Sequence, residues 1–170
     1  IKGYLFSKKF KPKFIFKVDG DNQIRSREIE KFLLILKKDK KIDCAKGNRF
    51  SKLNHFQEMP PLRLYGNKIV SLIGKIVTGY YNINDFTNGF FCISGSCLNR
   101  INLKLLSKDF FFENDMMIAL SSLKAKVVNV PTYCSYKGNK SNLKIYKIIL
   151  PFIFKFLTGY LNKNKFRKKY

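Results

Sequence analysis

The stretch FIFKVDGDNQ, residues 14–23, decides the fold class. Residues 14–18 form a short apolar, β-prone run, and the run stops at the turn formers Asp19-Gly20-Asp21-Asn22. This pattern is typical of a buried strand that ends in an acidic loop. Residues 25–38 follow with apolar side chains at helical spacing. The stretch therefore predicts a strand, a loop and a helix in succession.

The rest of the chain continues this alternation. Apolar runs and turn residues predict strands at residues 42–45, 90–94 and 126–130, and helices at residues 62–77 and 113–123. Strands that alternate with helices predict an α/β sheet with active groups at the strand ends. The polar segment 46–60 is long enough for a loop with a functional role.

Composition and charge limit the function classes. The chain has 170 residues, of which 45% are hydrophobic and 15% aromatic, and this excludes a disordered chain and predicts one core. The net charge of +23 favours polyanionic partners: nucleic acid, anionic lipid headgroups or phosphorylated small molecules. Charge alone does not choose among them, and an AT-rich genome also produces chains rich in Lys, Asn, Ile, Phe and Tyr. The first residue is Ile, so we expect a piece of a longer protein.

Cysteine and histidine usage argues against a zinc site. The four cysteines form no C-x-x-C pair and the single histidine is His55, so we expect reduced, buried thiols in a cytoplasmic protein. Residues 142–170 form an apolar and basic segment. Lysines interrupt it, so no uncharged run within it is long enough to span a bilayer. Such a segment either lies in a membrane interface or packs on the core as an ordinary helix, and we favour the interface.

The acidic loop after the first strand is the sharpest chemical feature. Asp19 and Asp21 lie one residue apart at a strand end, where two carboxylates can hold Mg²⁺ or Mn²⁺ and leave positions open for substrate phosphates. A D-x-D triplet alone is also a common surface turn, so its neighbours decide the interpretation.

Those neighbours resemble family 2 glycosyltransferases with the GT-A fold, in particular the polyprenyl-phosphate sugar synthases. Elements of that group are matched in order over residues 14–142: D-x-D-x-Q at 19–23, G-N-R-F at 47–50, M-P at 59–60, R-x-x-G-N at 63–67, T-G-Y at 78–80, D-x-x-x-G-F at 85–90, F-E-N-D at 112–115 and V-P at 130–131. The resemblance implies a partial GT-A catalytic domain at residues 1–141, a Rossmann-like α/β core with a mixed sheet flanked by helices. Its N-terminal strands and nucleobase loop would precede residue 1.

The resemblance implies specific roles for individual residues. Asp19, Asp21 and Gln23 would bind the metal and the donor diphosphate, and Arg49 and Arg63 would grip a diphosphate or an acceptor phosphate because a guanidinium forks onto phosphate oxygens. Asp85 is the first candidate for the base that deprotonates an acceptor hydroxyl and Asp115 the second. Substrate contacts are implied for Glu113, Tyr136 and Ser141. Glu113 and Asp115 are equally suited to stabilising a helix N-terminus.

These observations lead to one functional hypothesis and one alternative. We expect a metal-dependent transferase that moves a sugar, with inversion, from a nucleotide-diphosphate donor to polyprenyl phosphate or a membrane-proximal glycan, as in cell-envelope polysaccharide synthesis. It would act at the cytoplasmic face of a membrane, with an anionic membrane surface as partner and no nucleic acid. The alternative is a basic protein that binds nucleic acid or anionic membranes without catalysis.

Overall fold

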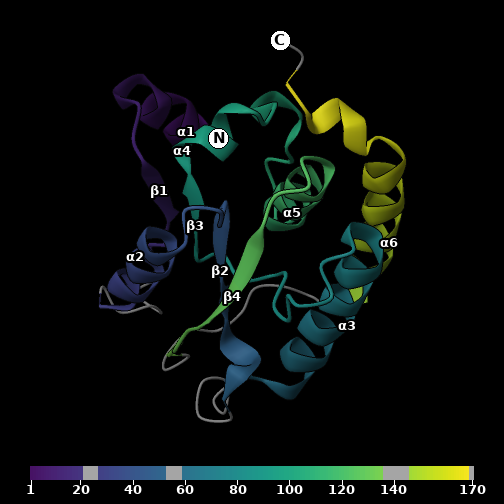
Figure 1. The fold of residues 1–170 in the computed structure, drawn as a ribbon. Coiled ribbons are helices and arrows are strands. Elements are labelled where there is room, and N and C mark those ends of the chain that lie inside the picture. The colour runs from purple at the N-terminus through teal and green to yellow at the C-terminus, as the bar shows by residue number, and fades with distance from the viewer. Residues whose placement is uncertain (21–26, 53–58, 136–145, 169–170) are drawn as a thin grey trace.

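The structure is a computed structural model that describes residues 1–20, 27–52, 59–135 and 146–168, with the side chains of 146–149 left out. Figure 1 shows a central sheet with helices on both of its faces. The strands are β1 (Phe14–Lys17), β2 (Cys44–Asn48), β3 (Phe91–Ser94) and β4 (Val127–Pro131). The helices are α1 (Lys2–Ser7), α2 (Glu28–Lys38), α3 (Pro61–Thr78), α4 (Gly95–Asn99), α5 (Phe112–Ser122) and α6 (Tyr146–Leu161).

The sheet is mixed and its strands do not follow chain order. The order is β1-β3-β2-β4, in which β3 runs antiparallel to both neighbours and β2 runs parallel to β4. Within the described part of the chain, no strand pairs with the other edge of β1. This order brings the ends of β1 and β2 to either side of the segment that leads into β3.

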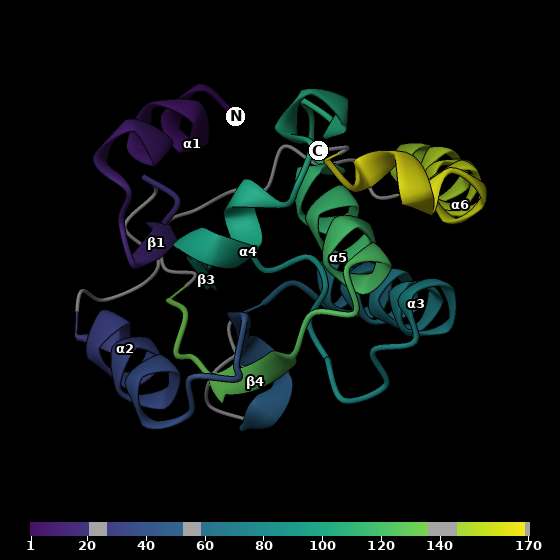
Figure 2. The same ribbon diagram turned by 45° about the horizontal axis from the view of Figure 1, so that its top comes forward.

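Strand alternation divides the core into two layers. Phe91 and Ile93 of β3 face α3, α5 and α6, whereas Phe90 and Cys92 face α2 and meet Phe32. Figure 2 shows the same division, with α2 on one side of the sheet and α3, α5 and α6 together on the other. The sheet has one core region on each face, because every strand contributes apolar side chains to both faces.

The predicted elements are confirmed with shifted boundaries, except that the first strand, predicted to be buried, is the half-buried edge strand β1. The strand expected at residues 42–45 is Cys44–Asn48, because Gly47 and Asn48 continue the parallel pairing with Val130 and Pro131. The helix expected from residue 25 is described from Glu28. The short helices α1 and α4 were not predicted, since six and five residues are too few for a periodic apolar pattern.

The helical part of the 142–170 segment is α6, which packs on α3 and α5. No helix in the described ranges has both the length and the apolar character that crossing a bilayer requires. The division of the chain at residue 141 stays a prediction.

The ring of Phe86 locks α3 onto the segment before β3. Phe86 is fully buried, its backbone N–H donates to Ser71 Oγ at 3.1 Å, and its ring lies on Gly74. A Cβ at Gly74 would come within 2.5 Å of that ring, so the close approach of helix and loop requires glycine there.

We expect Gly74→Ala to lower the free energy of unfolding by about 1–2 kcal/mol, because overpacking against a buried ring outweighs the gain in helix propensity. Gly3→Ala is the matched control, since a Cβ there meets nothing within 4 Å and the helix gains propensity. Urea unfolding of both variants checks this. A Gly74→Ala protein as stable as wild type would contradict the packing described here.

Candidate functional site

The carboxylate of Asp19 lies just beyond the end of β1 and is joined to α5 through a lysine. Lys17 and Asp19 are two residues apart and therefore point to the same side of the chain. Lys17 Nζ lies 2.5 Å from Asp19 Oδ1 and 3.0 Å from Glu113 Oε1. Burial lowers the pKa of Lys17, but the carboxylates of Glu113 and Asp19 outweigh it and the net shift is upward. Lys17 is therefore a fixed cation between two acids from different elements.

The backbone of Gly89 packs directly against the carboxylate of Asp19. A Cβ built on Gly89 would overlap Asp19 Oδ2 and would lie 2.8 Å from Lys17 Nζ. The missing side chain is what lets Asp19 pack directly on the backbone before β3. The Asp19 side chain itself is 52% exposed, so one side of the carboxylate remains open to solvent.

Arg49 and Asp85 form a buried ion pair at the end of β2. Asp85 Oδ2 accepts from Arg49 Nε at 2.7 Å and from the Arg49 backbone N–H at 3.0 Å, and Asp85 Oδ1 accepts from Arg49 Nη2 at 2.7 Å. Arg49 Nη2 also donates to Thr87 Oγ1 at 2.8 Å. The Asp85 side chain is 0% exposed and that of Arg49 6%. Two-point pairing of this kind fixes the geometry of both groups.

A second buried cation holds the segment between Asp85 and Gly89. Lys46 of β2 is 1% exposed, and its Nζ donates to the backbone carbonyl of Asn88 and lies 5.2 Å from the ring centre of Phe91. Burial lowers the pKa of Lys46 to about 8. Residues 85–89, which we call the site loop, are thus held by Arg49 at one end, by Lys46 near the middle and against Asp19 at the other end.

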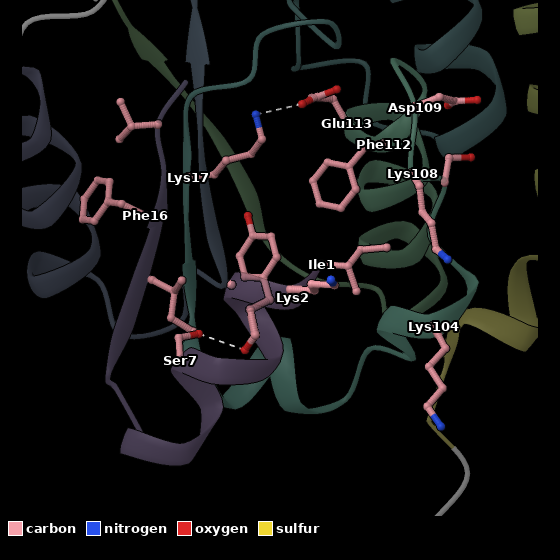
Figure 3. A pocket seen from close by; sticks show the side chains of 15 residues that line it. Ile1, Lys2, Ser7, Phe16, Lys17, Lys104, Lys108, Asp109, Phe112 and Glu113 are labelled. Atoms are coloured by element: carbon pink, nitrogen blue, oxygen red, sulfur yellow. Dashed lines mark hydrogen bonds and ion pairs between the residues drawn. The ribbon is translucent and has the colours of Figure 1, made fainter. Parts of the chain in front are cut away.

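A cavity of about 900 Å³ opens beside Lys17 and Glu113. It is lined by α1, β1, the start of α5 and the segment before α5 that carries Lys104, Ser107 and Lys108. In Figure 3, Lys17 and Glu113 point toward each other, while Lys104 and Lys108 lie along another side of the lining. The cavity combines apolar walls with several ammonium groups, which suits a ligand that carries a phosphate.

Two further predicted residues lie apart from these contacts. Asp115 is 6% exposed, and its Oδ2 accepts from the Ser107 backbone N–H at 2.7 Å. Burial raises the pKa of Asp115. Arg63 is half-buried in the first turn of α3. Asp21, Gln23, Tyr136 and Ser141 fall outside the described residues.

The described part of the site offers the type of ligand atom that a hard divalent cation prefers. Asp19 offers carboxylate oxygen with an open side, and Mg²⁺ and Mn²⁺ prefer such oxygen donors. Among the residues whose placement is described, no group of three or more His, Cys, Asp or Glu side chains gathers into a complete ligand set. Asp21, which the sequence predicts as the second metal-binding carboxylate beside Asp19, lies in the 21–26 segment, outside the described ranges.

Sequence reasoning missed the two lysines that organise this region. Lys17 lies inside the apolar run 14–18, and a charge in such a run was the available signal. Lys46 falls in the segment 46–60 that was predicted as a loop, so its pattern carried no such signal. Lys46 donates to Asn88, 42 positions away, and Lys17 reaches Glu113 on a distant helix, so spacing along the chain did not identify these two contacts. Asp19 lies just beyond the end of β1, as its position after an apolar run predicts, whereas Asp85 lies in the loop between α3 and β3 and reaches the end of β2 only through Arg49.

No protein-family model matches the chain, and no curated protein matches its sequence. The chain is similar in structure to glucosyl-3-phosphoglycerate synthase from Mycobacterium tuberculosis. The complex of that enzyme with uridine diphosphate superposes with a TM-score of 0.56 at 11% identity, over 92% of this chain and 51% of the synthase. Its complex with Mn²⁺, UDP-glucose and glycerol 3-phosphate gives 0.51 at 8% identity over the same shares.

A third complex, with Mn²⁺, uridine diphosphate and glucosyl-3-phosphoglycerate, gives a TM-score of 0.51 at 11% identity. The chain spans about half the length of this structural neighbour. At such identities the similarity concerns the fold. Together with the mixed, helix-flanked sheet, it shows that the chain has the α/β fold of a GT-A glycosyltransferase core.

Proposed function

We propose that this chain is the catalytic core of a metal-dependent family 2 glycosyltransferase that moves a sugar from a nucleotide-diphosphate donor to an acceptor at a membrane surface. The observation that carries the proposal is the placement of Asp19 at the end of β1, backed by Gly89 and tied through Lys17 to Glu113, within a GT-A sheet. The structural neighbour was crystallised with uridine diphosphate, UDP-glucose and Mn²⁺, which fits a nucleotide-sugar donor.

In the proposed donor site, Asp19, Asp21 and Gln23 hold Mg²⁺ or Mn²⁺ together with the diphosphate. The bound metal supplies Lewis-acid stabilisation of the charge that develops on the departing diphosphate. Arg63 is the better candidate for a phosphate contact, because Arg49 is buried and pairs with Asp85 through two nitrogens. We assign Arg49 the role of fixing the site loop, so that Gly89 can support Asp19.

The acceptor hydroxyl needs a base that reaches it. A base must lie within hydrogen-bond distance of the proton that it removes. Asp85 is fully buried and Asp115 faces the Ser107 backbone, whereas Glu113 lines the cavity next to Lys17. We therefore place Glu113 first as the proton acceptor, and Asp85 and Asp115 as groups that position the site. If the acceptor is itself a phosphate, no base is needed and Glu113 orients Lys17.

The acceptor we propose is a polyprenyl phosphate or a membrane-proximal glycan, with inversion at the anomeric carbon and with Tyr136 and Ser141 closing over the substrate. The neighbour's complexes contain a phosphoglycerate product and glycerol 3-phosphate, so a phosphate-bearing acceptor is compatible with this fold. The basic segment 142–170 would hold the enzyme at the cytoplasmic face of the membrane. A basic binding protein without catalysis is less favoured, since it leaves the ordered carboxylates at the strand ends without a role.

Replacing both aspartates of the acidic loop tests the donor site. We expect Asp19→Ala combined with Asp21→Ala to abolish Mn²⁺-dependent binding of UDP- or GDP-sugars in isothermal titration calorimetry, because the carboxylates hold the metal. Asp39→Ala, which removes an exposed acid paired with Lys126, is the control that should bind as wild type does. Tight binding that ignores both the metal and the double substitution would refute the assignment.

Removing the charge of Lys17 tests whether it competes with the metal for Asp19. We expect Lys17→Met to bind Mn²⁺ about tenfold more tightly in the absence of nucleotide, because a cation no longer neutralises the carboxylates. Electron paramagnetic resonance of free Mn²⁺ measures this directly. Lys13→Met removes an equal charge from an exposed position and should change the affinity little. Weaker Mn²⁺ binding by Lys17→Met would show that the lysine organises the site rather than competes for it.

Variants of Asp85 and Glu113 should separate an effect on folding stability from an effect on the rate of sugar transfer. We expect Asp85→Asn to lower the free energy of unfolding by about 3 kcal/mol, because the buried Arg49 loses its anionic partner. Glu113→Gln should change stability by less than about 1 kcal/mol but strongly reduce sugar transfer to a lipid extract. Urea unfolding and a radiolabelled-sugar assay give the two readouts. An Asp85→Asn protein of normal stability that has lost only turnover would restore Asp85 as the base.

A further inference from the structure

Two adjacent helices expose regular apolar stripes to solvent. On α3 the stripe comprises Leu62, Tyr65, Ile69, Leu72 and Ile76, each between 44% and 65% exposed. On α6 it comprises Leu150, Phe154, Leu157, Tyr160 and Leu161, each between 45% and 81% exposed. Both sets recur every three or four residues, so each occupies one side of its helix. We call the two stripes together the α3–α6 face.

The two stripes belong to one region of the molecule. Helices α3 and α6 pack against each other, and they lie side by side in both Figure 1 and Figure 2. The inner sides of the same helices are already used: Val70 and Gly74 of α3 and Phe156 of α6 are buried in the core. Both of these neighbouring helices therefore present apolar side chains to solvent, and exposed apolar surface on adjacent elements is a mark of interaction sites.

The charged residues of the two helices that carry the α3–α6 face are all basic. Helix α3 contains Arg63, Lys68 and Lys75 and no acidic residue. Residues 150–168, which are described, contain Lys155, Lys163, Lys165, Arg167 and Lys168 and no Asp or Glu. Lys155 is paired with Asp109 at 2.5 Å, which neutralises one of the positive charges beside α6. An apolar face with a basic surround matches the acyl and headgroup layers of an anionic membrane.

We propose that the α3–α6 face is a membrane-binding surface that lies on anionic phospholipid with α3 and α6 in the plane of the interface. Exposed Tyr65, Phe154 and Tyr160 supply the aromatic side chains that favour this layer. A second copy of the chain fits the face less well, because a self-complementary interface would bring the basic surrounds of two molecules together. The proposal extends the membrane role of residues 142–170 to α3, which lies in the catalytic core.

This surface also bears on the proposed acceptor. Arg63 stands next to Leu62, at the end of the α3 stripe, and is the residue that we assign to phosphate binding. With the α3–α6 face on a bilayer, Arg63 would lie near the level of lipid phosphates. Only this point rests on the proposed function, since membrane binding is measured without any sugar transfer.

The test is co-sedimentation of the full chain with vesicles of phosphatidylcholine, with and without phosphatidylglycerol. We expect binding that needs phosphatidylglycerol and weakens at least about tenfold in the triple variant Ile69→Gln, Leu72→Gln, Ile76→Gln, because apolar burial and lipid charge both contribute. The α6 variant Leu150→Gln, Phe154→Gln, Leu157→Gln should weaken binding to a similar degree. The control Phe6→Gln, Phe10→Gln, Leu34→Gln alters equally exposed residues on other elements and should bind as wild type does.

Three outcomes would overturn the proposal. They are no binding of the wild type to anionic vesicles, equal binding by the wild type and both stripe variants, or an equal loss in the control variant. If the wild type ignores vesicles but sediments as a dimer that the α3 variant dissociates, the face is a contact between copies. Thermal unfolding checks that each variant is folded. The Asp19→Ala, Asp21→Ala protein should still bind vesicles, so a failed donor site and a failed membrane surface are distinguishable.

Discussion

The buried pair between Arg49 and Asp85 is the interaction on which the site depends. It joins the end of β2 to the start of the site loop through two nitrogens of one guanidinium, with both side chains almost fully out of water. A buried ion pair of this kind contributes little net stability over an apolar packing but is costly to break on one side only. Its effect here is therefore geometric: it fixes where the site loop begins, and so where Gly89 meets Asp19.

Around the site loop, two lysine side chains occupy positions where most protein cores have apolar side chains. The ammonium group of Lys46 donates to the Asn88 carbonyl, and that of Lys17 lies between the carboxylates of Asp19 and Glu113. Each of these ammonium groups takes a partner from a segment distant in the sequence, so each also holds two elements together. The low exposure of Lys46 makes its charge expensive, and its lowered pKa reflects that cost. The Asn88 carbonyl offsets part of that cost for Lys46, as the carboxylates of Asp19 and Glu113 do for Lys17.

Much of the fold was predictable because it follows from local patterns. Apolar runs that end in turn residues located all four strands, and helical spacing located α2, α3 and α5. The order β1-β3-β2-β4 was not predictable from periodicity, since pairing between distant strands leaves no local signal. For the site, Asp19 was identifiable from its position after a β-prone run. The depth of Asp85 and the contacts of Lys17 depend on that strand order and required the structure.

Helix α3 lies between the site loop and the α3–α6 face. Its inner side fixes the site loop, since Ser71 accepts from the Phe86 backbone and Gly74 receives the Phe86 ring. Phe86 follows Asp85 directly, so a shift of α3 would be passed to the Arg49–Asp85 pair. The outer side of the same helix carries half of the α3–α6 face. A helix that moves as a rigid body would carry a displacement from its outer side to the site loop through the Phe86 contacts. Lipid bound against α3 would then also hold the site loop in place.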